Sequence, residues 1–571
     1  MRLLLVLLAL LRPASALWPL PQHLEQQHTA VRLAANLSIH LPGDHPAPPD
    51  IHQAIAATLA LIRNDRHQPM AVDRGDALYH QQPAAAAADL LCAHPFTNAS
   101  YPPPAHAAPS ILAEMQQPLQ TRSEAYELTI HRPGQHAQEE YAAVLSASSA
   151  LGVLRGLQTF AQLPAGGAPI RFLYGPLLIK DRPAFPYRGL LLDTSRNFYS
   201  LASIRKTIET MSWAKLNLLH WHIVDAQSWP LHLPAHPQLS RHGAYAAHQT
   251  YSLEDLKELA RFANARGVEI LLEVDTPGHT AVVGEAYPDL VACKDKTPWS
   301  NYAAEPPAGQ LRIADERALA LVNEIFATLT TQVPGTLFSS GGDEVNKRCY
   351  EEDGPTQTRL RQQNQTLSQA LASFVQATHA TIRRAGKVPV VWEELVLDEA
   401  IPLPVDHTLV AVWRNSSMVE KVVQKGYSII HGASDYSYLD CGLGGWLGNS
   451  VNGTSWCDPY KTWQKIYSFD PYKNVAPAQH HQVLGGQALL WSEQTDEQNM
   501  DAIIWPRALA TAEVYWTGNT GRARSVTEAL PRMHDMRYRI VQRGVRAAPL
   551  QPHWCAVRPG LCDLPAGTQE N

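Results

Sequence analysis

"SSGGDEVN", residues Ser339–Asn346, sets two glycines directly before two adjacent carboxylates, Asp343 and Glu344. An apolar run ending in Leu337 and Phe338 precedes it, which is typical of a strand running into a core. Glycine near a strand end indicates a bend or a close approach of the backbone to another group, here a substrate. The stretch therefore predicts a buried strand whose end presents two negative charges.

Similar apolar runs recur along the chain, and most of them are followed by an amphipathic helical stretch. The eight strand candidates are "GLLLDTS", "LNLLHWHIVD", "VEILLEVD", "TLFSSGGDE", "VPVVWEE", "LVAVWRN", "YSIIHGASDYSYLD" and "VLGGQALLWSE". Eight alternations over about 330 residues favour a (β/α)8 barrel over an open sheet. We place this barrel at residues 185–545.

Polar and aromatic side chains stand at or just past the ends of these runs. They are Asp193, Asp225, Asp275, Asp343, Glu344, Glu393, Glu394, Arg414, Asp440 and Glu493, with Trp392, Trp413 and Trp491. A barrel gathers the carboxyl ends of its strands on one face, where its active sites lie. A strand that turns polar on leaving the core explains one or two of these residues, but not a ring. Aromatic faces together with carboxylates and Arg188 suit the C–H faces and hydroxyls of a sugar.

Residues 1–16 are predicted to be a secretory signal peptide. Arg2 precedes the apolar run Leu3–Leu11, and Ala14 to Ala16 fit a cleavage site. That run is too short to span a bilayer, and no other run reaches about 18 residues. We therefore expect a secreted, extracellular protein with no membrane partner. Five possible glycosylation sites suit that route: Asn36, Asn98, Asn364, Asn415 and Asn452.

Three further segments complete the predicted organisation. Residues 17–165 alternate apolar side chains in "EAYELTIH" and space them helically in "LSASSALGVLRGLQTFAQL", which indicates a small α+β domain. "PAGGAP" opens a predicted linker at residues 166–184. Residues 546–571 are predicted to be a C-terminal tail with a small disulfide loop.

Seven cysteines fit an oxidising compartment with one left over. Cys555 with Cys562, and Cys441 with Cys457, are close enough in sequence to close small loops. Of the remaining three, Cys293 with Cys349 would tie the segments on either side of "GGDE" together. Buried unpaired thiols are the alternative for these pairs, and the state of Cys92 stays open.

Other classes of protein are less well supported. The net charge of -6 is nearly balanced and no Lys/Arg cluster suits a phosphate backbone, so nucleic acid is not an expected partner. A metal-dependent barrel hydrolase is one alternative, because His220 and His222 in "HWH" share a strand face. A sugar-binding protein without activity is another, but it predicts loss of the acid, and Glu344 is present.

The chain resembles glycoside hydrolase family 20, and in particular its secreted fungal β-N-acetylhexosaminidases. The motifs that carry the resemblance are "YRGLLLDTSRNF", "KLNLLHWHIVDAQSWP", "EVDTPGHT", "GGDEV", "VVWEE", "SYLDCG", "GTSWC", "YKTWQKIY", "ALLWSEQ" and "WPRALATAE". The resemblance implies a barrel with a small α+β companion domain and a homodimer. It also implies cleavage of terminal β-linked GlcNAc or GalNAc with retention, without metal or other cofactor.

The resemblance also implies roles for individual residues. Glu344 is the general acid/base, Asp343 orients the 2-acetamido group, and Tyr438 binds its carbonyl. The other implied site residues are Arg188 and Glu493 on the ring hydroxyls, Asp440 near the hydroxymethyl end, Trp392, Trp413 and Trp491 as walls, Trp456 at the rim, and Asp225 and His279 beside the carboxylate pair. Ala226 follows Asp225 where vertebrate relatives have a second acid, which bears on the choice between GlcNAc and GalNAc.

Overall fold

The computed structural model describes residues 17–32, 37–41, 47–65, 90–93, 110–131, 142–165, 171–519, 524–558 and 560–564. The predicted signal peptide, Asn36, Asn98 and the side chain of Cys92 lie outside this description. The chain forms two compact units. One comprises Met1–Ser110, Ser123–Pro183 and Asn519–Asn571, and the other comprises Ile111–Arg122 and Ala184–Gly518.

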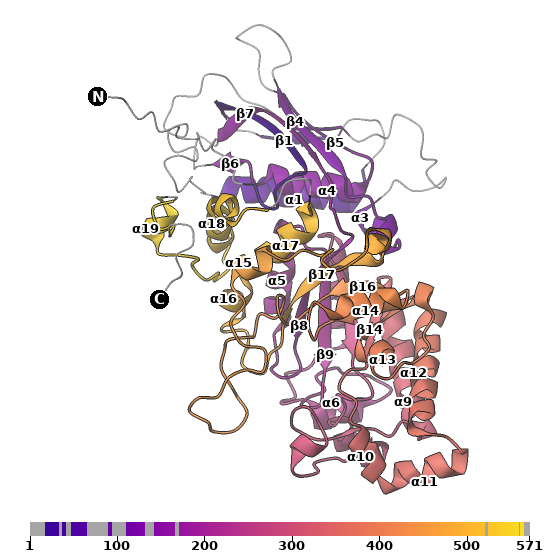
Figure 1. Cartoon of the computed structure of the whole chain (residues 1–571). Helices are drawn as coiled ribbons and strands as arrows, with labels where there is room; N and C mark the ends of the chain where they lie inside the picture. The colour runs from indigo at the N-terminus through magenta and orange to yellow at the C-terminus, as the bar shows by residue number, and fades with distance from the viewer. Residues whose placement is uncertain are drawn as a thin grey trace. The chain divides into compact units, whose positions relative to one another are not determined.

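The second unit is built on a closed barrel of parallel strands, in the order β10-β13-β14-β15-β16-β17-β8-β9 (Figure 1). This confirms the predicted (β/α)8 barrel, and each of the eight strand candidates supplies one strand. The strands are β8 (Tyr187–Asp193), β9 (Leu218–Val224), β10 (Glu269–Val274), β13 (Leu337–Gly341), β14 (Val388–Trp392), β15 (Leu409–Val412), β16 (Ser428–His431) and β17 (Val483–Leu490).

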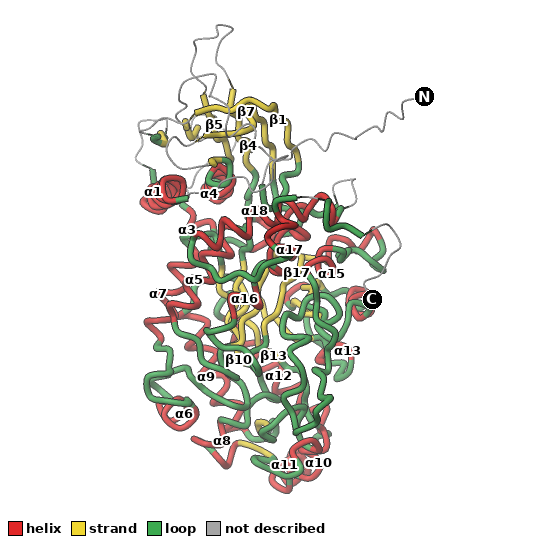
Figure 2. The backbone as a smooth tube through the Cα atoms, turned by 90° about the vertical axis from the view of Figure 1, so that its left-hand side faces the viewer, coloured by secondary structure: helices red, strands yellow, loops and turns green. Residues whose placement is uncertain are grey.

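Helices surround this barrel, as Figure 2 shows with red helices outside the yellow strands. The longer ones are α5 (Leu201–Trp213), α7 (Leu253–Asn264), α9 (Glu316–Gln332), α12 (Leu367–Arg384) and α17 (Arg507–Thr517). Ser252 and Thr366 open α7 and α12 with capping boxes, which satisfy backbone N–H groups of the first turn. Shorter helices are α3 (Ile111–Glu114), α6 (Pro237–Gly243), α8 (Val283–Ala286), α10 (Lys347–Glu352), α11 (Gly354–Gln363), α13 (Glu394–Leu397), α14 (Met418–Gln424), α15 (Trp463–Tyr467) and α16 (Met500–Ile504).

The barrel strands are buried along nearly their whole length, because helices cover their outer faces and side chains fill the interior. Leu191, Leu218, Leu271 and Leu489 belong to the apolar core. The interior is not wholly apolar, since β9 and β10 bury histidine and glutamate side chains within it. Those polar groups must be paired to be stable there.

The first unit is an α+β domain around a sheet in the order β1-β7-β4-β5-β3-β2, with β6 beside β7. Its helices α1 (Pro49–Asn64) and α4 (Ala150–Phe160) lie on one face of the sheet (Figure 1). Alternate residues of β4 are buried, as the pattern of "EAYELTIH" predicts. The strands are β1 (His23–Arg32), β2 (Ile39–His40), β3 (Leu90–Ala93), β4 (Tyr126–His131), β5 (Ala142–Ala147), β6 (Pro164–Ala165) and β7 (Arg171–Asp181).

Two predicted boundaries differ from the structure. The linker at 166–184 is wrong for Arg171–Asp181, which form β7 between β1 and β4, because an apolar alternation resumes after the "PAGGAP" turn. The predicted barrel end at 545 is too late, because α18 (Val526–Gln542) belongs to the first unit. There Arg539 and Arg543 form ion pairs with Asp65.

All three predicted disulfides are confirmed: Cys293–Cys349, Cys441–Cys457 and Cys555–Cys562. The first joins the loop after β10 to α10, just beyond "GGDE". The second closes the loop that follows β16. Among the described residues, no helix has the length and apolar character needed to cross a membrane.

Candidate active site

The end of β13 bends sharply at the two glycines before Asp343. Gly341 and Gly342 have φ angles of 63° and 100°, in the region that favours glycine. A Cβ at Gly341 would collide with the carboxylate of Asp275, whose Oδ1 accepts a hydrogen bond of 2.7 Å from the Gly342 N–H. The bend is thus as predicted, but the close approach is to Asp275 of the neighbouring strand end.

Glu344 also has a left-handed backbone, with φ of 53°. For a residue with a long side chain this conformation costs on the order of 1 kcal/mol, so the surrounding structure must hold it in place. Gly278 lies so close to the Asp343 carbonyl that a Cβ there would clash with it. The turn is therefore fixed from both sides, and it directs Asp343 and Glu344 into a common space.

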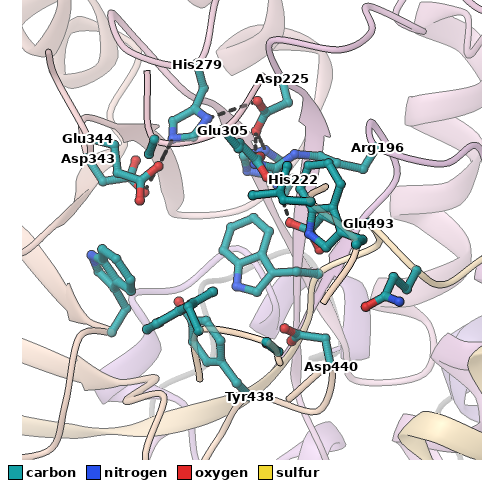
Figure 3. A pocket seen from close by; sticks show the side chains of 18 of the residues that line it. Arg196, His222, Asp225, His279, Glu305, Asp343, Glu344, Tyr438, Asp440 and Glu493 are labelled. Atoms are coloured by element: carbon teal, nitrogen blue, oxygen red, sulfur yellow. Dashed lines mark hydrogen bonds and ion pairs between the residues drawn. The ribbon is translucent and has the colours of Figure 1, made fainter. Parts of the chain in front are cut away.

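A cavity of about 290 Å³ opens at the carboxyl ends of the strands, and it contains both carboxylates (Figure 3). Most of its lining comes from segments that follow β8, β9, β10, β13, β15, β16 and β17. The lining residues are Arg196, His222, Asp225, Asp275, His279, Ala304, Glu305, Asp343, Glu344, Trp413, Tyr438, Asp440, Leu443, Trp446, Leu447, Ser455, Trp456, Trp491, Glu493 and Gln494.

His279 connects the carboxylate pair to Asp225, as Figure 3 shows. Its Nε2 is 3.2 Å from Glu344 Oε2 and 3.8 Å from Asp343 Oδ2. Its Nδ1 is 3.0 Å from Asp225 Oδ1, so the N–H at this position donates to the carboxylate. Burial would lower the pKa of His279, but Asp225 and Asp343 raise it well above its usual value. His279 Nε2 is therefore suited to form a hydrogen bond with the Glu344 carboxyl group.

Asp343 lies in a setting that opposes its ionisation. Burial, with the Asp275 carboxylate beside it, raises its pKa well above the usual range. Its Oδ1 is buried and has no hydrogen-bond partner in the part of the chain that the structure describes. Such a group is costly unless a ligand satisfies it, which is a property of binding sites rather than of scaffold.

Four aromatic side chains form one side of the cavity. Trp413 stacks on Tyr438 with their ring centroids 6.4 Å apart, and both rings meet Trp456 edge-on at 5.6 and 5.7 Å. Trp491 is 6.3 Å from Tyr438. Trp392 lies outside the lining, where it is 1% exposed and packs 6.1 Å from Trp491. The predicted wall is therefore assembled, with Trp392 supporting it from the core.

The predicted role of Arg188 is wrong, because this side chain does not reach the cavity. It is the second residue of β8, at the opposite end of the strand from the site, and it is fully buried. Its Nε and Nη1 donate to the carbonyls of Lys215 and Phe185 at 3.0 and 2.9 Å. The arginine at the site is Arg196, three residues past the end of β8, so the strand-end rule that selects the carboxylates also points to Arg196.

Arg196 lies against the cavity wall and is surrounded by acidic groups. Its guanidinium is 3.2 Å from Asp193, 3.0 Å from Asp225 and 3.8 Å from Glu493, and it also pairs with Glu305. Burial would lower the pKa of Arg196, but these carboxylates raise it well above its usual value. Glu305 had no signal in the sequence, because it lies in an irregular loop far from the end of any barrel strand.

Asp440 and Glu493 line the cavity across from His279 (Figure 3). Burial raises the pKa of Asp440 to about 7, and its Oδ1 is buried without a hydrogen-bond partner among the described residues. Burial also raises the pKa of Glu493 well above its usual value. Both carboxyls are thus placed to bind hydroxyls of a ligand, either as acceptors or, when protonated, as donors.

The "HWH" histidines are bound to carboxylates rather than left open for a metal. His220 Nε2 is 3.0 Å from Glu273 Oε2, and its Nδ1 is 3.3 Å from Gln487 Oε1. His222 Nδ1 is 2.6 Å from Glu273 Oε1, and its Nε2 is 2.7 Å from Asp225 Oδ2. All four ring nitrogens are therefore within hydrogen-bond distance of another side chain, which does not favour the metallohydrolase alternative.

Known proteins are similar to this chain in both sequence and fold. The glycosyl hydrolase family 20 catalytic-domain model matches residues 185–519, and a model described as beta-acetyl hexosaminidase like matches residues 17–163. A β-hexosaminidase of Arthroderma benhamiae is 37% identical over 463 residues, 77% of this chain and 74% of that protein. A chitooligosaccharidolytic β-N-acetylglucosaminidase of Bombyx mori is 36% identical over 458 residues, 77% of this chain and 74% of that protein.

Solved structures agree in fold. An exo β-N-acetylglucosaminidase of Vibrio harveyi superposes with a TM-score of 0.72 at 20% identity, covering 94% of this chain and 78% of that one. The chain belongs to glycosyl hydrolase family 20. Its activity is that of a β-N-acetylhexosaminidase, which is a glycoside hydrolase.

Proposed function

We propose that Glu344 is the general acid/base of this reaction and that Asp343 orients the 2-acetamido group of the substrate. The observation that carries the proposal is the bend at Gly341 and Gly342, which turns two consecutive carboxylates into one cavity beside His279. Two carboxylates used as acid and nucleophile would have to lie on opposite sides of the scissile bond. Consecutive residues suit a scheme in which the substrate supplies the nucleophile.

In the first step, the acetamido carbonyl oxygen attacks the anomeric carbon while the Glu344 carboxyl gives its proton to the leaving oxygen. The glycosidic C–O bond breaks and an oxazolinium ion forms, whose positive charge favours the ionised form of Asp343 that burial beside Asp275 otherwise opposes. In the second step, Glu344 takes a proton from water, which attacks the anomeric carbon and reopens the ring. Two inversions give net retention, and the enzyme returns to its starting protonation state.

The remaining residues would hold the sugar for these steps. Tyr438, which is 2% exposed and lines the cavity, would donate its O–H to the acetamido carbonyl, with Trp413 and Trp491 around the methyl group. Arg196 replaces Arg188 as the cation on the ring hydroxyls, together with Glu493, and Asp440 serves the hydroxymethyl end. Trp456, which is 66% exposed, lies at the rim where a second sugar would arrive.

Inhibition by an oxazolinium mimic tests the proposal. An N-acetylglucosamine thiazoline should inhibit competitively and bind far more tightly than N-acetylglucosamine, because it resembles the intermediate. Aryl β-glucosides, which lack the acetamido group, should be hydrolysed at least about 1,000-fold more slowly than the N-acetyl substrate. Equal rates on both substrates, with no thiazoline inhibition, would contradict the scheme.

We further propose that the protein is a secreted glycoprotein that acts on chitooligosaccharides and glycans as a homodimer. The predicted signal peptide and three disulfides support secretion, and the similarity to a chitooligosaccharidolytic enzyme supports the substrate. The homodimer is what the resemblance to the family implies. Asn364 and Asn452 are exposed and Asn415 is half-buried, so glycans can be accommodated at the first two sites. Mass spectrometry of the exported protein, before and after deglycosylation, tests the processing at Leu17 and the occupied sites.

A further inference from the structure

His222 lies between two carboxylates inside the barrel. Its Nδ1 is 2.6 Å from Glu273 Oε1, and its Nε2 is 2.7 Å from Asp225 Oδ2. All three side chains are at most 1% exposed. The contacts are therefore shielded from bulk solvent, and the protonation of this group of residues is decided mainly by its internal partners.

The two distances determine the form of the imidazole ring. A neutral histidine has one N–H and one lone pair, so one of its nitrogens would face a carboxylate oxygen lone pair to lone pair. An imidazolium donates from both nitrogens and satisfies both carboxylates. Burial would lower the pKa of His222, but the hydrogen bonds with Asp225 and Glu273 raise it to about 10. The cation is thus the stable form over the range in which a glycosidase works.

Asp225 joins this cation to the catalytic pair. Its Oδ2 contacts His222 and also Arg196, while its Oδ1 accepts from the Nδ1–H of His279. Burial would raise the pKa of Asp225, but Arg196, His279 and His222 hold it well below its usual value. The contacts of Oδ2 with His222 and Arg196 fix the orientation of the carboxylate, so Oδ1 is held in direction for His279.

Further groups surround His222 from every strand end that packs on it. Trp491 meets its ring edge-on at 5.0 Å, and Asp193 is its register neighbour on β8. Glu273 is itself held by His220 at 3.0 Å and by the Ser339 hydroxyl. The charged and titratable groups of this set are Asp193, Arg196, His220, Asp225, Glu273, Asp275 and His279.

We propose that His222 is a positioning residue for hydrolysis: as an imidazolium clamped by Glu273 and Asp225, it fixes the Asp225 carboxylate that orients His279 toward Glu344. The inference rests on the proposed role of Glu344 and deepens it. It also gives the "HWH" motif a purpose without a metal. His222 never touches the sugar in this account, and it acts only through Asp225 and His279.

Three variants separate this role from simple packing. His222→Gln keeps one donor but removes the buried positive charge, so kcat should fall roughly 10- to 100-fold while KM changes less than about threefold. Loss of a nearby cation favours protonated forms, so both limbs of the pH profile of kcat/KM should move to higher pH. Glu273→Gln removes a negative charge instead, so its limbs should move to lower pH.

His220→Gln is the matched control. His220 lies two residues earlier on the same strand face and also contacts Glu273, but it does not contact Asp225. It should keep kcat within about threefold and leave the pH profile in place. The melting temperature of each variant shows whether it is folded. Shifts of both charge variants in the same direction, or an equal loss in His220→Gln, would overturn the proposal.

A spectroscopic measurement tests the protonation state directly. In protein with 15N-labelled histidine, the ring signals that are missing from His222→Gln should show both nitrogens protonated at pH 8. A neutral ring at that pH would overturn the proposal for His222. Thiazoline inhibition of the wild-type enzyme tests the catalytic scheme independently. A failure of the proposed role of His222 can therefore be distinguished from a failure of the proposed role of Glu344.

Discussion

Two sets of carboxylates lie at the same end of the barrel and differ in how they are paired. Asp225 and Glu273 are fully buried against Arg196 and three histidines, and these partners hold both pKa values below the usual range despite burial. Asp343 and Asp440 line the cavity, as Asp225 also does, but each of them has a buried oxygen without a partner among the described residues. Burial raises both of their pKa values. Paired acids thus serve as scaffold, while incompletely paired acids are available to a substrate.

The largest expected effect is at Glu344, whose loss removes the proton donor. Glu344→Gln should lower kcat about 1,000-fold or more on chitobiose, which has a poor leaving group, and far less on an activated aryl glycoside. Steady-state kinetics on both substrates checks this. An equal loss on the two would mean that Glu344 does not protonate the leaving oxygen.

The second largest effect is expected for Asp343→Asn, which should reduce kcat about 100- to 1,000-fold and change KM less. A neutral amide keeps the shape of the carboxylate but cannot balance the charge that develops on the acetamido group. Asp275→Asn is the matched comparison, because Asp275 accepts a hydrogen bond from the bend at the Gly342 N–H and its charge raises the pKa of Asp343. A larger loss in Asp275→Asn than in Asp343→Asn would reverse the assignment.

Stability should respond in opposite directions in the two sets. The folded-state pKa of Asp440 is about 7, above its model-peptide value of 3.8, so the ionised form costs stability as pH rises through this window. Asp440→Asn should therefore melt about 2 °C higher than wild type at pH 8, with the difference vanishing near pH 4.

Glu273 has a lowered pKa and contributes stability above its unfolded value, so Glu273→Gln should melt lower than wild type at pH 8. Thermal melts of both variants at pH 4 and pH 8 provide the measurement. If both variants were destabilised at pH 8, Asp440 would belong with the scaffold carboxylates.

The smallest effect is expected at Trp456, because it is exposed and lies at the rim. Trp456→Ala should raise KM for chitooligosaccharides about 3- to 10-fold, which corresponds to the loss of one aromatic contact. KM for a small aryl N-acetylglucosaminide should hardly change. A similar rise for both substrates would place Trp456 around the first sugar instead.

The barrel could be predicted because its signal is local and repeated. Each strand carries its own apolar run, and polar residues such as Asp225 and Asp343 stand where that run stops, whereas Asp440 lies in the loop that follows β16. The prediction of a linker at residues 166–184 was wrong for the opposite reason. The turn residues of "PAGGAP" do not reveal that β7 follows them in the same sheet. Pairing between distant strands is set by tertiary contacts that no short window contains.

The site residues could likewise be predicted where they lie close to a strand end. Strand-end position predicts most of the carboxylates, but Arg188 lies inside a strand, where its side chain donates to backbone carbonyls instead of binding a ligand. Glu305 reaches Arg196 from a long irregular loop, so only the folded chain reveals it. The pairing of His222 with Glu273 crosses two strands, and it too depends on the barrel register.

A trapping experiment with a 5-fluoro glycosyl substrate, followed by peptide mass spectrometry, tests the central claim most directly. If the acetamido group is the nucleophile, no sugar becomes attached to the peptide that contains Asp343 and Glu344, although turnover slows. That result is the one we predict. A covalent glycosyl adduct on Asp343 would contradict the account and return the enzyme to a mechanism with two protein carboxylates.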